Sequence, residues 1–368
     1  MQSRKRILLL ADANSSHTIK WATGLASKGF PVAIFSLAAP KQDWYSAPGV
    51  LVSCPELKDK QPANSGDWKK LNYGKSMSDL KTLLNEFKPD VVHAHYATSY
   101  GMLGRKLRFH PFFISVWGTD VIQFPHKSFL HKWFLKKNLR AADRLFSTSK
   151  MLQEEVLRIS ARDSEVIPFG IDTKIFRRME HASDFGEDAL VIGTIKSLEK
   201  YYCVDVLIES FARIFQKHRH LKLRLLIVGD GSEREKLEGL SAKLGIQEYV
   251  TFTGKIPYDR IHEYHNRIGI FANLSEYESF GVSVLEASAC EVPVVATETG
   301  GLKEVVINNE TGFLVPVRDI ESTVAALEKL VSDDKLRKNM GAAGRKYVTS
   351  YFDFEACLQK MIDAYNTC

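Results

Sequence analysis

Two glutamates with seven residues between them stand in the segment NLSEYESFGVSVLEASACEVPVVATETGG, which otherwise has the apolar residues of a buried core. Glu278 falls in the polar loop expected after the strand IFANL, and Glu286 falls one turn inside the helix expected from VSVLEASA. A loop carboxylate can accept hydrogen bonds from sugar hydroxyls, and one in the first turns of a helix can accept the paired hydroxyls of a ribose. The alternative is a helix-capping acid followed by an exposed helical acid.

Glycines surround these acids in a pattern that favours a phosphate site. Gly281 allows the backbone to approach a ligand closely at the expected start of the helix. The segment ATETGGLKEVV repeats the order of strand, glycine-rich loop and helix, and it could supply further N–H groups. A ligand with hydroxyls and phosphates fits both features.

The elements that must position these residues alternate regularly along the chain. Short β-branched or aromatic runs are separated by helical stretches, namely RILLLA, PVAIFSL, DVVHAH, FFISVW and RLFSTS, then LVIGTI, LRLLIVG, YVTFTG, IGIFANL and VPVVAT. Continuous apolar strands linked by helices are typical of parallel sheets covered on both faces, so two doubly wound α/β domains in tandem are expected. We place the joint near IPFGIDTKIFRRMEHASDFGEDA, after the strand SEVIP. The last helix, DFEACLQKMIDAY, has one apolar face that must pack against a domain.

Composition limits the class of protein. The 368 residues are 45% hydrophobic and 26% charged, and no apolar run reaches the ~18 residues needed to cross a bilayer. Five widely spaced cysteines without a C-x-x-C favour a reducing cytoplasm over disulfides or zinc. Residues 1–175 hold 26 Lys and Arg against 15 Asp and Glu, a net charge of +11, and the remainder carries −5. The basic half suggests an anionic partner, with a merely solubilising surface as the alternative.

Several motifs together resemble one enzyme family. They are ESFGVSVLE followed by VPVVATETGGLKEVVINNETGFLV, then VGDGSEREKLEGLSAKLGIQEYVTFTGKIP, IPFGIDTKIF, HAHYAT and WGTDV. This set resembles the retaining GT-B glycosyltransferases of family four. The resemblance implies two Rossmann-like domains facing a central cleft. Residues 1–172 would bind the acceptor, with a C-terminal helix 353–368 packing back on them, and residues 173–352 would bind the sugar-nucleotide donor.

The resemblance also implies a donor site. Glu278, Phe280 and Gly281 would contact the donor hexose, Glu286 the ribose, and Lys196 and Lys200 the diphosphate of a UDP- or GDP-linked sugar. Ser279 and Val282 would complete the donor-binding residues. Lys196 takes the place of the arginine usual in the family, which preserves charge but loses the bidentate guanidinium. Lys200 is displaced by about one residue from the usual lysine, and a surface role is the alternative for it.

On the acceptor side the resemblance points to His17, His95, Trp117 and Asp120. Similar enzymes often have histidine where this chain has Trp117, and Asp120 is the only carboxylate in that loop. A retaining transfer can give the acceptor proton to the departing phosphate, so loss of that histidine is compatible with catalysis. We expect Glu278, Lys196 and Asp120 to be the catalytic residues. A helix-start histidine is the alternative for His17.

No metal or other cofactor is expected. His93 and His95 share a strand face, but no third ligand accompanies them in the sequence. The chain also has no D-x-D pair, which metal-dependent transferases of the other common fold use to hold Mg²⁺ or Mn²⁺.

A basic, aromatic-rich stretch, HKSFLHKWFLKKNLRAADR at residues 126–144, offers a second kind of partner. A helix of this composition can lie on an anionic membrane, and it resembles the membrane-docking helices of transferases with lipid-linked acceptors. The alternative is that its apolar face is ordinary domain core. No nucleic-acid recognition motif accompanies the charge.

The sequence therefore predicts a cytoplasmic retaining hexosyltransferase, peripheral at the inner face of the membrane. It would use a nucleoside-diphosphate sugar and a saccharide or lipid-linked saccharide acceptor in cell-surface polysaccharide synthesis. The alternatives are a sugar-nucleotide epimerase of the same fold and a non-catalytic subunit that binds a sugar nucleotide.

Overall fold

The chain forms two compact units, one made of residues 1–169 and 357–368 and the other of residues 170–356. The computed structural model describes residues 4–41, 43–46, 48–55, 74–179, 185–186 and 188–368. The joint expected between 172 and 173 falls just inside the second unit. Residues 180–184 and 187 of the expected joint segment lie outside the described residues.

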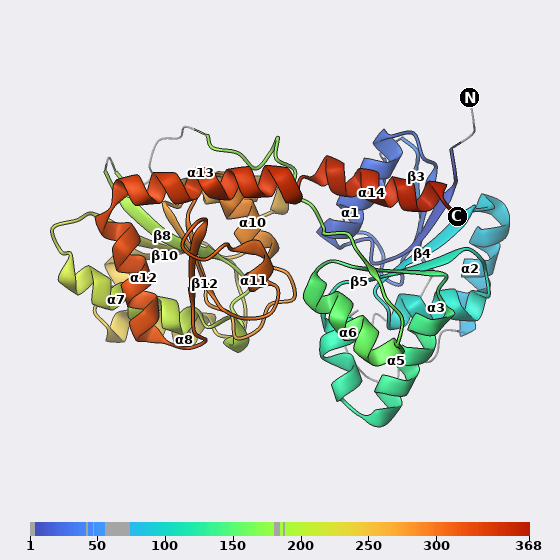
Figure 1. Cartoon of the computed structure of the whole chain (residues 1–368), viewed down its shortest axis with the longest axis horizontal. Helices are drawn as coiled ribbons and strands as arrows, with labels where there is room; N and C mark the ends of the chain where they lie inside the picture. Colours follow the sequence, from blue (N-terminus) through green and yellow to red (C-terminus); the bar gives the residue numbers. More distant parts are fainter. Residues whose placement is uncertain (1–3, 42, 47, 56–73, 180–184, 187) are drawn as a thin grey trace. The chain divides into compact units, whose positions relative to one another are not determined.

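A seven-stranded parallel sheet forms the centre of the first unit, in the order β3-β2-β1-β4-β5-β6-β7. The strands are β1 Ile7–Leu10, β2 Val32–Phe35, β3 Val50–Ser53, β4 Val91–His95, β5 Phe112–Val116, β6 Arg144–Ser147 and β7 Glu165–Val166. The helices are α1 Ser16–Ser27, α2 Gly74–Phe87, α3 Ser99–Leu107, α4 Thr119–Ile122, α5 Phe129–Ala141, α6 Lys150–Ser160 and the C-terminal α14 Phe354–Asn366. The sheet is a doubly wound one, with helices on both faces (Figure 1).

The two faces of this sheet are filled by different residues. Leu8, Leu10, Val92 and Ala94 belong to the core beneath α2, α3, α5 and α6. On the opposite face, His93 in β4 is fully buried, and its Nδ1 lies 2.7 Å from the hydroxyl of Tyr365 in α14. The apolar face of the C-terminal helix therefore completes the first unit.

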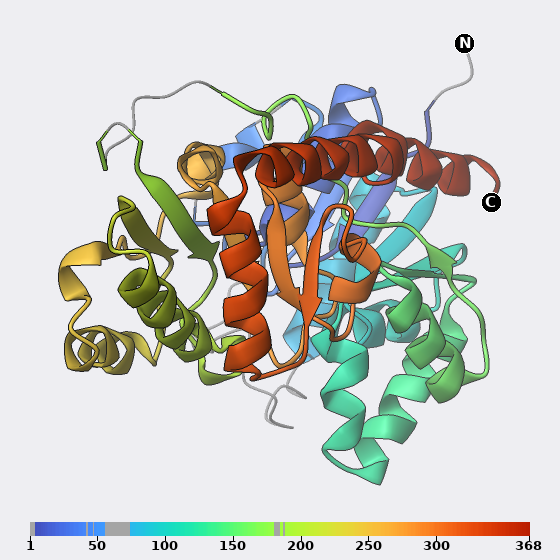
Figure 2. The ribbon, with the colours of Figure 1, turned by 60° about the vertical axis from the view of Figure 1, so that its left-hand side comes forward.

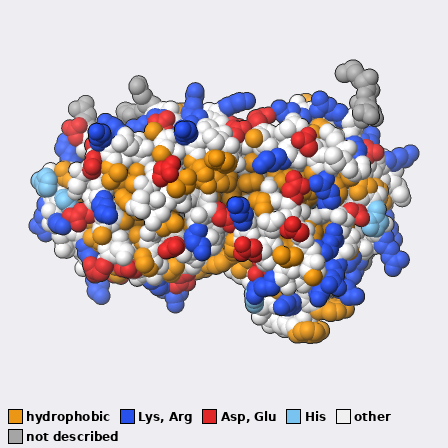
Figure 3. Space-filling model, viewed as in Figure 1, with side chains coloured by type: hydrophobic (Ala, Val, Ile, Leu, Met, Phe, Trp, Pro, Cys, Tyr) orange, Lys and Arg blue, Asp and Glu red, His pale blue; other side chains and the backbone are white. Residues whose placement is uncertain are grey.

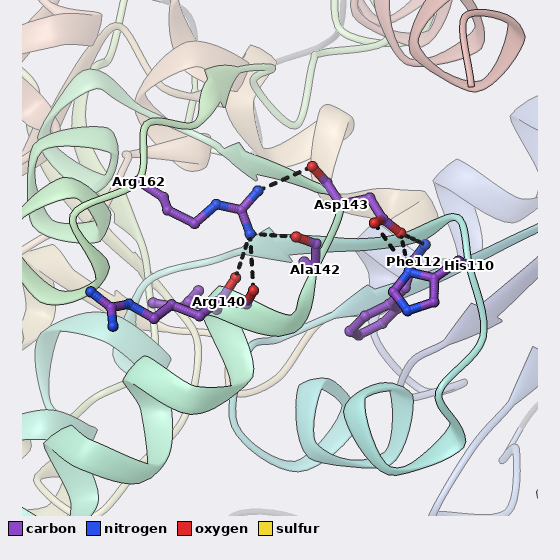
Figure 4. A network of polar contacts seen from close by, with 7 residues as sticks. His110, Phe112, Arg140, Ala142, Asp143 and Arg162 are labelled. Carbon is purple, nitrogen blue, oxygen red and sulfur yellow. Dashed lines mark hydrogen bonds and ion pairs between the residues drawn. The ribbon is translucent and has the colours of Figure 1, made fainter.

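The C-terminal end of α5 is closed by an arginine from outside the helix. The guanidinium of Arg162 donates hydrogen bonds to the carbonyls of Leu139 and Arg140 at 3.2 and 3.3 Å, and also to that of Ala142 (Figure 4). It reaches the carbonyl of Asp143 as well, at 3.1 Å. These contacts satisfy carbonyls that a helix end leaves without partners, so α5 has a fixed C-terminus.

The second unit has a six-stranded parallel sheet in the order β10-β9-β8-β11-β12-β13. Figure 2 shows the ribbon of this unit from a second direction. Its strands are β8 Leu190–Ile195, β9 Leu223–Val228, β10 Val250–Phe252, β11 Ile270–Asn273, β12 Val294–Thr297 and β13 Gly312–Val315. The helices are α7 Val204–Lys217, α8 Arg234–Lys243, α9 Ile261–Arg267, α10 Val282–Ala289, α11 Leu302–Val305, α12 Ile320–Ser332 and α13 Asp334–Tyr351. In both units the prediction of doubly wound α/β domains is confirmed.

The order of strands in the second unit decides where its ligand residues meet. β8 lies beside β11, and β11 lies beside β12, so the carboxyl ends of these three strands are neighbours. Ligands of open parallel sheets bind at such ends. Among the described residues, no helix is both long enough and apolar enough to cross a membrane.

Candidate active site

A lysine and a glutamate expected to contact the donor are brought together in the second unit. Lys196 directly follows β8, and Glu278 lies in the loop between β11 and α10. The ammonium of Lys196 forms an ion pair with Oε2 of Glu278, and each side chain is only 14% exposed. The ammonium also lies 4.3 Å from the ring centre of Tyr202, a cation–π distance.

Two glycines hold the backbone around Glu278. The N–H of Gly301 donates to the carbonyl of Glu278 at 2.8 Å, and a Cβ on Gly300 would meet that carbonyl oxygen at 2.0 Å. A side chain at either glycine would push the two loops apart, since a Cβ on Gly301 would lie 2.6 Å from Cα of Phe280. The loop of residues 298–301, which follows β12, thus packs directly on the loop that carries Glu278.

The helix after this loop begins at a glycine in a left-handed conformation. Gly281, with φ of 105°, precedes α10, so the N–H groups of Val282 and its neighbours begin the helix. Phe280 is almost completely buried and lies beside the ring of Phe352, whereas Ser279 is half-buried. This anchored aromatic side chain fixes the direction in which α10 leaves the loop.

Glu286 lies in α10 and is buried, with 4% of its surface exposed. Its carboxylate accepts a hydrogen bond from the hydroxyl of Tyr258 at 3.0 Å and lies 3.4 Å from Nε2 of the buried His265. Burial and the charge of Glu286 raise the pKa of Tyr258, so this phenol stays a donor. Sequence reasoning missed Tyr258 and His265, because each belongs to an element remote in sequence from Glu286. It also missed Tyr202, six residues after Lys196, because the short 3₁₀ turn that brings its ring to the ammonium has no sequence pattern.

Lys200, the second cation expected at the diphosphate, lies in the short 3₁₀ helix η4, Lys200–Tyr202. Its side chain is exposed, and Tyr202 of the same turn is the residue that contacts Lys196. The phosphate role expected of Lys200 stays a prediction.

The residues expected on the acceptor side form an aromatic cluster in the first unit. The ring of His17 stacks on Phe169 with centres 3.8 Å apart, and Trp117 lies 5.3 Å from Phe169. Trp117 also lies 4.8 Å from His95 and 5.8 Å from His17. Burial lowers the pKa of both His17 and His95 to about 3, so both rings are neutral at pH 7. The histidine rings of the cluster are therefore uncharged.

Asp120 joins two loops of the first unit. Its fully buried carboxylate accepts hydrogen bonds from the N–H groups of Ala97 at 2.8 Å, Gly118 at 2.9 Å and Trp117 at 3.2 Å. Burial raises the pKa of Asp120, and these bonds oppose the increase. Asp120 therefore holds the loops after β4 and β5 in position. The catalytic role expected of it stays a prediction, and its oxygens are already occupied by backbone donors.

Both ring nitrogens of His93 also have polar partners within the first unit. Besides Tyr365, it contacts the hydroxyl of Ser115 at 2.8 Å through Nε2. In the part of the chain that the structure describes, no three His, Cys, Asp or Glu side chains come together as a metal site would require.

Two family models match the chain. The model of glycosyl transferases group 1 matches residues 176–347, and the model "Glycosyl transferase 4-like" matches residues 6–149. Among curated proteins, N-acetyl-alpha-D-glucosaminyl L-malate synthase of Bacillus anthracis is 27% identical over 293 residues, which are 76% of this chain and 74% of that protein.

Solved structures share the whole fold. Sucrose-phosphate synthase from Thermosynechococcus elongatus aligns with a TM-score of 0.84 at 23% identity, covering 99% of each chain. Anabaena Alr3699/HepE in complex with UDP and glucose aligns with a TM-score of 0.81 at 18% identity, covering 99% of this chain and 100% of that one. With one family model on each unit and this shared architecture, the chain belongs to the group 1 glycosyltransferases of the GT-B fold.

Proposed function

We propose that this glycosyltransferase moves a hexose from a nucleoside diphosphate to an acceptor hydroxyl with retention of anomeric configuration. The observation that carries the proposal is the meeting of Lys196 and Glu278 at the carboxyl ends of β8 and β11, beside the glycine loop after β12. A cation suits a diphosphate, and a carboxylate suits sugar hydroxyls. The buried Glu286, one helix turn into α10, is the proposed ribose partner.

In the proposed reaction the acceptor oxygen forms a bond to the anomeric carbon on the face from which the diphosphate leaves. The bond between that carbon and the phosphate oxygen breaks, and the acceptor proton passes to the departing phosphate. Negative charge grows on the diphosphate during this step, so the ammonium of Lys196 stabilises the transition state more than the ground state. The N–H groups at the start of α10 also stabilise the growing negative charge on the diphosphate.

The proposed acceptor is a saccharide, free or lipid-linked, used in making a cell-surface polysaccharide. The support is the ring cluster of the first unit, in which the half-buried, uncharged rings of His17 and Trp117 pack against the buried Phe169. The relative from Bacillus anthracis is named an N-acetyl-alpha-D-glucosaminyl L-malate synthase, so malate is included among the acceptors tested.

We also propose that α5 docks on an anionic membrane surface. Phe129, Leu130 and Trp133 at its first turns are 80%, 57% and 51% exposed, which argues against the alternative that they are core. Lys132 and Lys137 are exposed on the same helix, and the ammonium of Lys137 lies 5.4 Å from the ring of Trp133. Figure 3 shows hydrophobic side chains beside Lys and Arg at the lower tip, over the turn that leads into α5. Apolar anchors among lysines are what an anionic lipid surface binds.

The deciding experiment has two stages. A thermal-shift screen with UDP, GDP and their sugar derivatives identifies the donor, because a ligand at ~100 times its Kd stabilises a fold by about 2.7 kcal/mol. Product analysis with saccharide, lipid-linked and malate acceptors follows. Release of nucleoside diphosphate together with a new glycoside of the donor's anomeric configuration supports the proposal. Conversion of the sugar nucleotide alone would indicate an epimerase, and binding without any product would indicate a non-catalytic subunit.

Transfer should continue in excess EDTA. The reason is that Lys196 and the N-terminus of α10 take the place of a metal at the leaving diphosphate, and the sequence has no D-x-D pair. Initial rates with and without chelator measure this. Loss of activity that Mg²⁺ or Mn²⁺ restores would show that the leaving group needs a metal.

A further inference from the structure

The ion pair between Lys196 and Glu278 joins two groups that the proposed function assigns to different parts of one ligand. Lys196 is assigned to the diphosphate and Glu278 to the hexose, yet here each is the partner of the other. With 14% of each side chain exposed, the pair is largely removed from water. Separating it leaves two poorly hydrated charges unless both receive new partners.

The backbones that carry the pair are fixed, so only the side chains can rearrange. The N–H of Lys196 donates to the carbonyl of Val228 at 2.9 Å, and a Cβ on Gly229 would lie 1.8 Å from the carbonyl oxygen of Lys196. Glu278 is held in the same way by Gly300 and Gly301. The pair is therefore a property of two packed loops.

Tyr202 keeps the ammonium in place independently of Glu278. Its ring centre lies 4.3 Å from the Lys196 ammonium. The carbonyl of the preceding Tyr201 accepts a hydrogen bond at 2.8 Å from the N–H of Glu276, in the loop that carries Glu278. Lys196 thus retains its contact with the Tyr202 ring when the carboxylate leaves, whereas among the described residues the Glu278 carboxylate has only Lys196 as its partner.

We propose that Glu278 competes with the diphosphate for Lys196, and that this competition makes the site prefer an intact sugar nucleotide over the nucleoside diphosphate left after transfer. The inference rests on the proposed function. An intact donor replaces both partners, because its phosphate oxygens take the ammonium and its sugar hydroxyls donate to the carboxylate.

A nucleoside diphosphate replaces only one partner. Its phosphates take Lys196, but Glu278 is then left beside added negative charge without hydroxyl donors. The ion pair re-forms when the nucleotide departs, so Glu278 favours release of the spent donor. The carboxylate acts twice in this scheme, first on the hexose and then on product release.

Glu278→Gln separates this scheme from a simple sugar contact. The amide keeps the shape and an acceptor oxygen but removes the charge that competes for Lys196. We expect it to bind inorganic pyrophosphate, and UDP or GDP according to the base selected, about tenfold more tightly than the parent. A tenfold gain in affinity corresponds to a free energy at the low end of the range for a hydrogen bond between charged groups. The parent's preference for the sugar nucleotide over the free nucleotide should shrink correspondingly.

Glu276→Gln is the matched control. Glu276 lies two residues earlier in the same loop and loses the same charge, but its ion pair is with Arg318. Its affinities for pyrophosphate and nucleotide should stay within about twofold of the parent's, the size of a surface electrostatic effect. Calorimetric titrations of all three proteins give the affinities, and melting curves without ligand verify that each is folded.

The outcomes separate this inference from the proposed function. If the parent binds a nucleotide and Glu278→Gln binds it and pyrophosphate no more tightly, the competition is refuted and the donor site stands. An equal gain in the Glu276→Gln control would also refute it, since general charge would then explain the effect. If neither nucleotides nor sugar nucleotides bind any of the three proteins, the proposed function fails, and the inference fails with it.

Discussion

Among the residues of the donor site, Lys196 gives the most specific prediction about the rate of catalysis. Replacing it with alanine removes the cation at the leaving diphosphate, so kcat should fall by about 10²–10³, the usual effect of deleting one preorganised donor of charge stabilisation. Lys196→Arg should keep most of the activity, because the charge is preserved. Steady-state kinetics measure both, and an undiminished kcat in the alanine variant would transfer the phosphate role to Lys200.

Asp120 is expected to matter for stability. In Asp120→Asn an amide nitrogen replaces one acceptor oxygen and faces a backbone N–H, which leaves a buried donor unsatisfied. The free energy of unfolding should fall by about 1–3 kcal/mol. The midpoint of urea unfolding measures the change, and Asp259→Asn, at an exposed position, is the control that should stay within ~0.5 kcal/mol. If Asp120→Asn is as stable as the parent, Asp120 does not hold the loops after β4 and β5 in position.

Among the helices, α5 has the most testable surface. Replacing Phe129 and Trp133 by serine removes two of the three exposed apolar anchors while leaving the buried Leu135 and Leu139 in the core. Binding to vesicles with anionic lipid should fall several-fold, and the parent's binding should weaken as salt rises, because each Lys near the surface contributes ~1 kcal/mol that salt screens. Sedimentation with anionic and neutral vesicles measures both effects.

The outcome for neutral vesicles decides the α5 proposal. Equal binding of the parent to the two vesicle types would mean that its lysines have no partner in the membrane. A serine variant that still binds anionic vesicles fully would mean that the exposed rings are not anchors.

Much of the element structure could be predicted from the sequence because it is local. Apolar runs such as LVIGTI and IGIFANL coincide with β8 and β11, and the helix with Glu286 is where its pattern places it. Edge strands β3 and β13 were not predicted, because β3 is half-exposed and β13 starts at a glycine, so neither has a continuous apolar run.

The contacts of the site could not be predicted because they depend on strand order. Lys196 meets Glu278, 82 positions away, only because β8 and β11 are neighbours in the sheet. Tyr258 meets Glu286 through a turn before α9 that has no regular pattern. Residue types suggested the ligand chemistry, but the pairing of those residues with one another requires the fold.

At the scale of the whole molecule, buried histidines make stability depend on pH. The pKa values of His17 and His95 are lowered to about 3, and that of His93 lies well below its usual value, in each case chiefly by burial. Below pH ~6.5 the unfolded chain binds protons at these residues while the folded chain does not, so stability falls as pH falls towards 3. His17 and His95 alone should remove about 3 kcal/mol between pH 6.5 and 5, and His93 acts in the same direction.

Urea unfolding at pH values between 7 and 5 measures this loss. His95→Gln removes one of these groups, so its stability should fall by about 1.5 kcal/mol less than the parent's over the same interval. A loss as large as the parent's would assign the pH dependence to other groups.

The C-terminal helix has a consequence for how the chain is made. Tyr365, which contacts His93, belongs to the first unit, yet it is translated after the entire second unit. At ~5–20 residues per second, the roughly 190 residues between Phe169 and Cys357 take about 10–40 s to synthesise. During that interval the emerging first unit has an uncovered sheet face that includes His93 and Phe113. On the ribosome, the half that is synthesised first is therefore the half that is completed last.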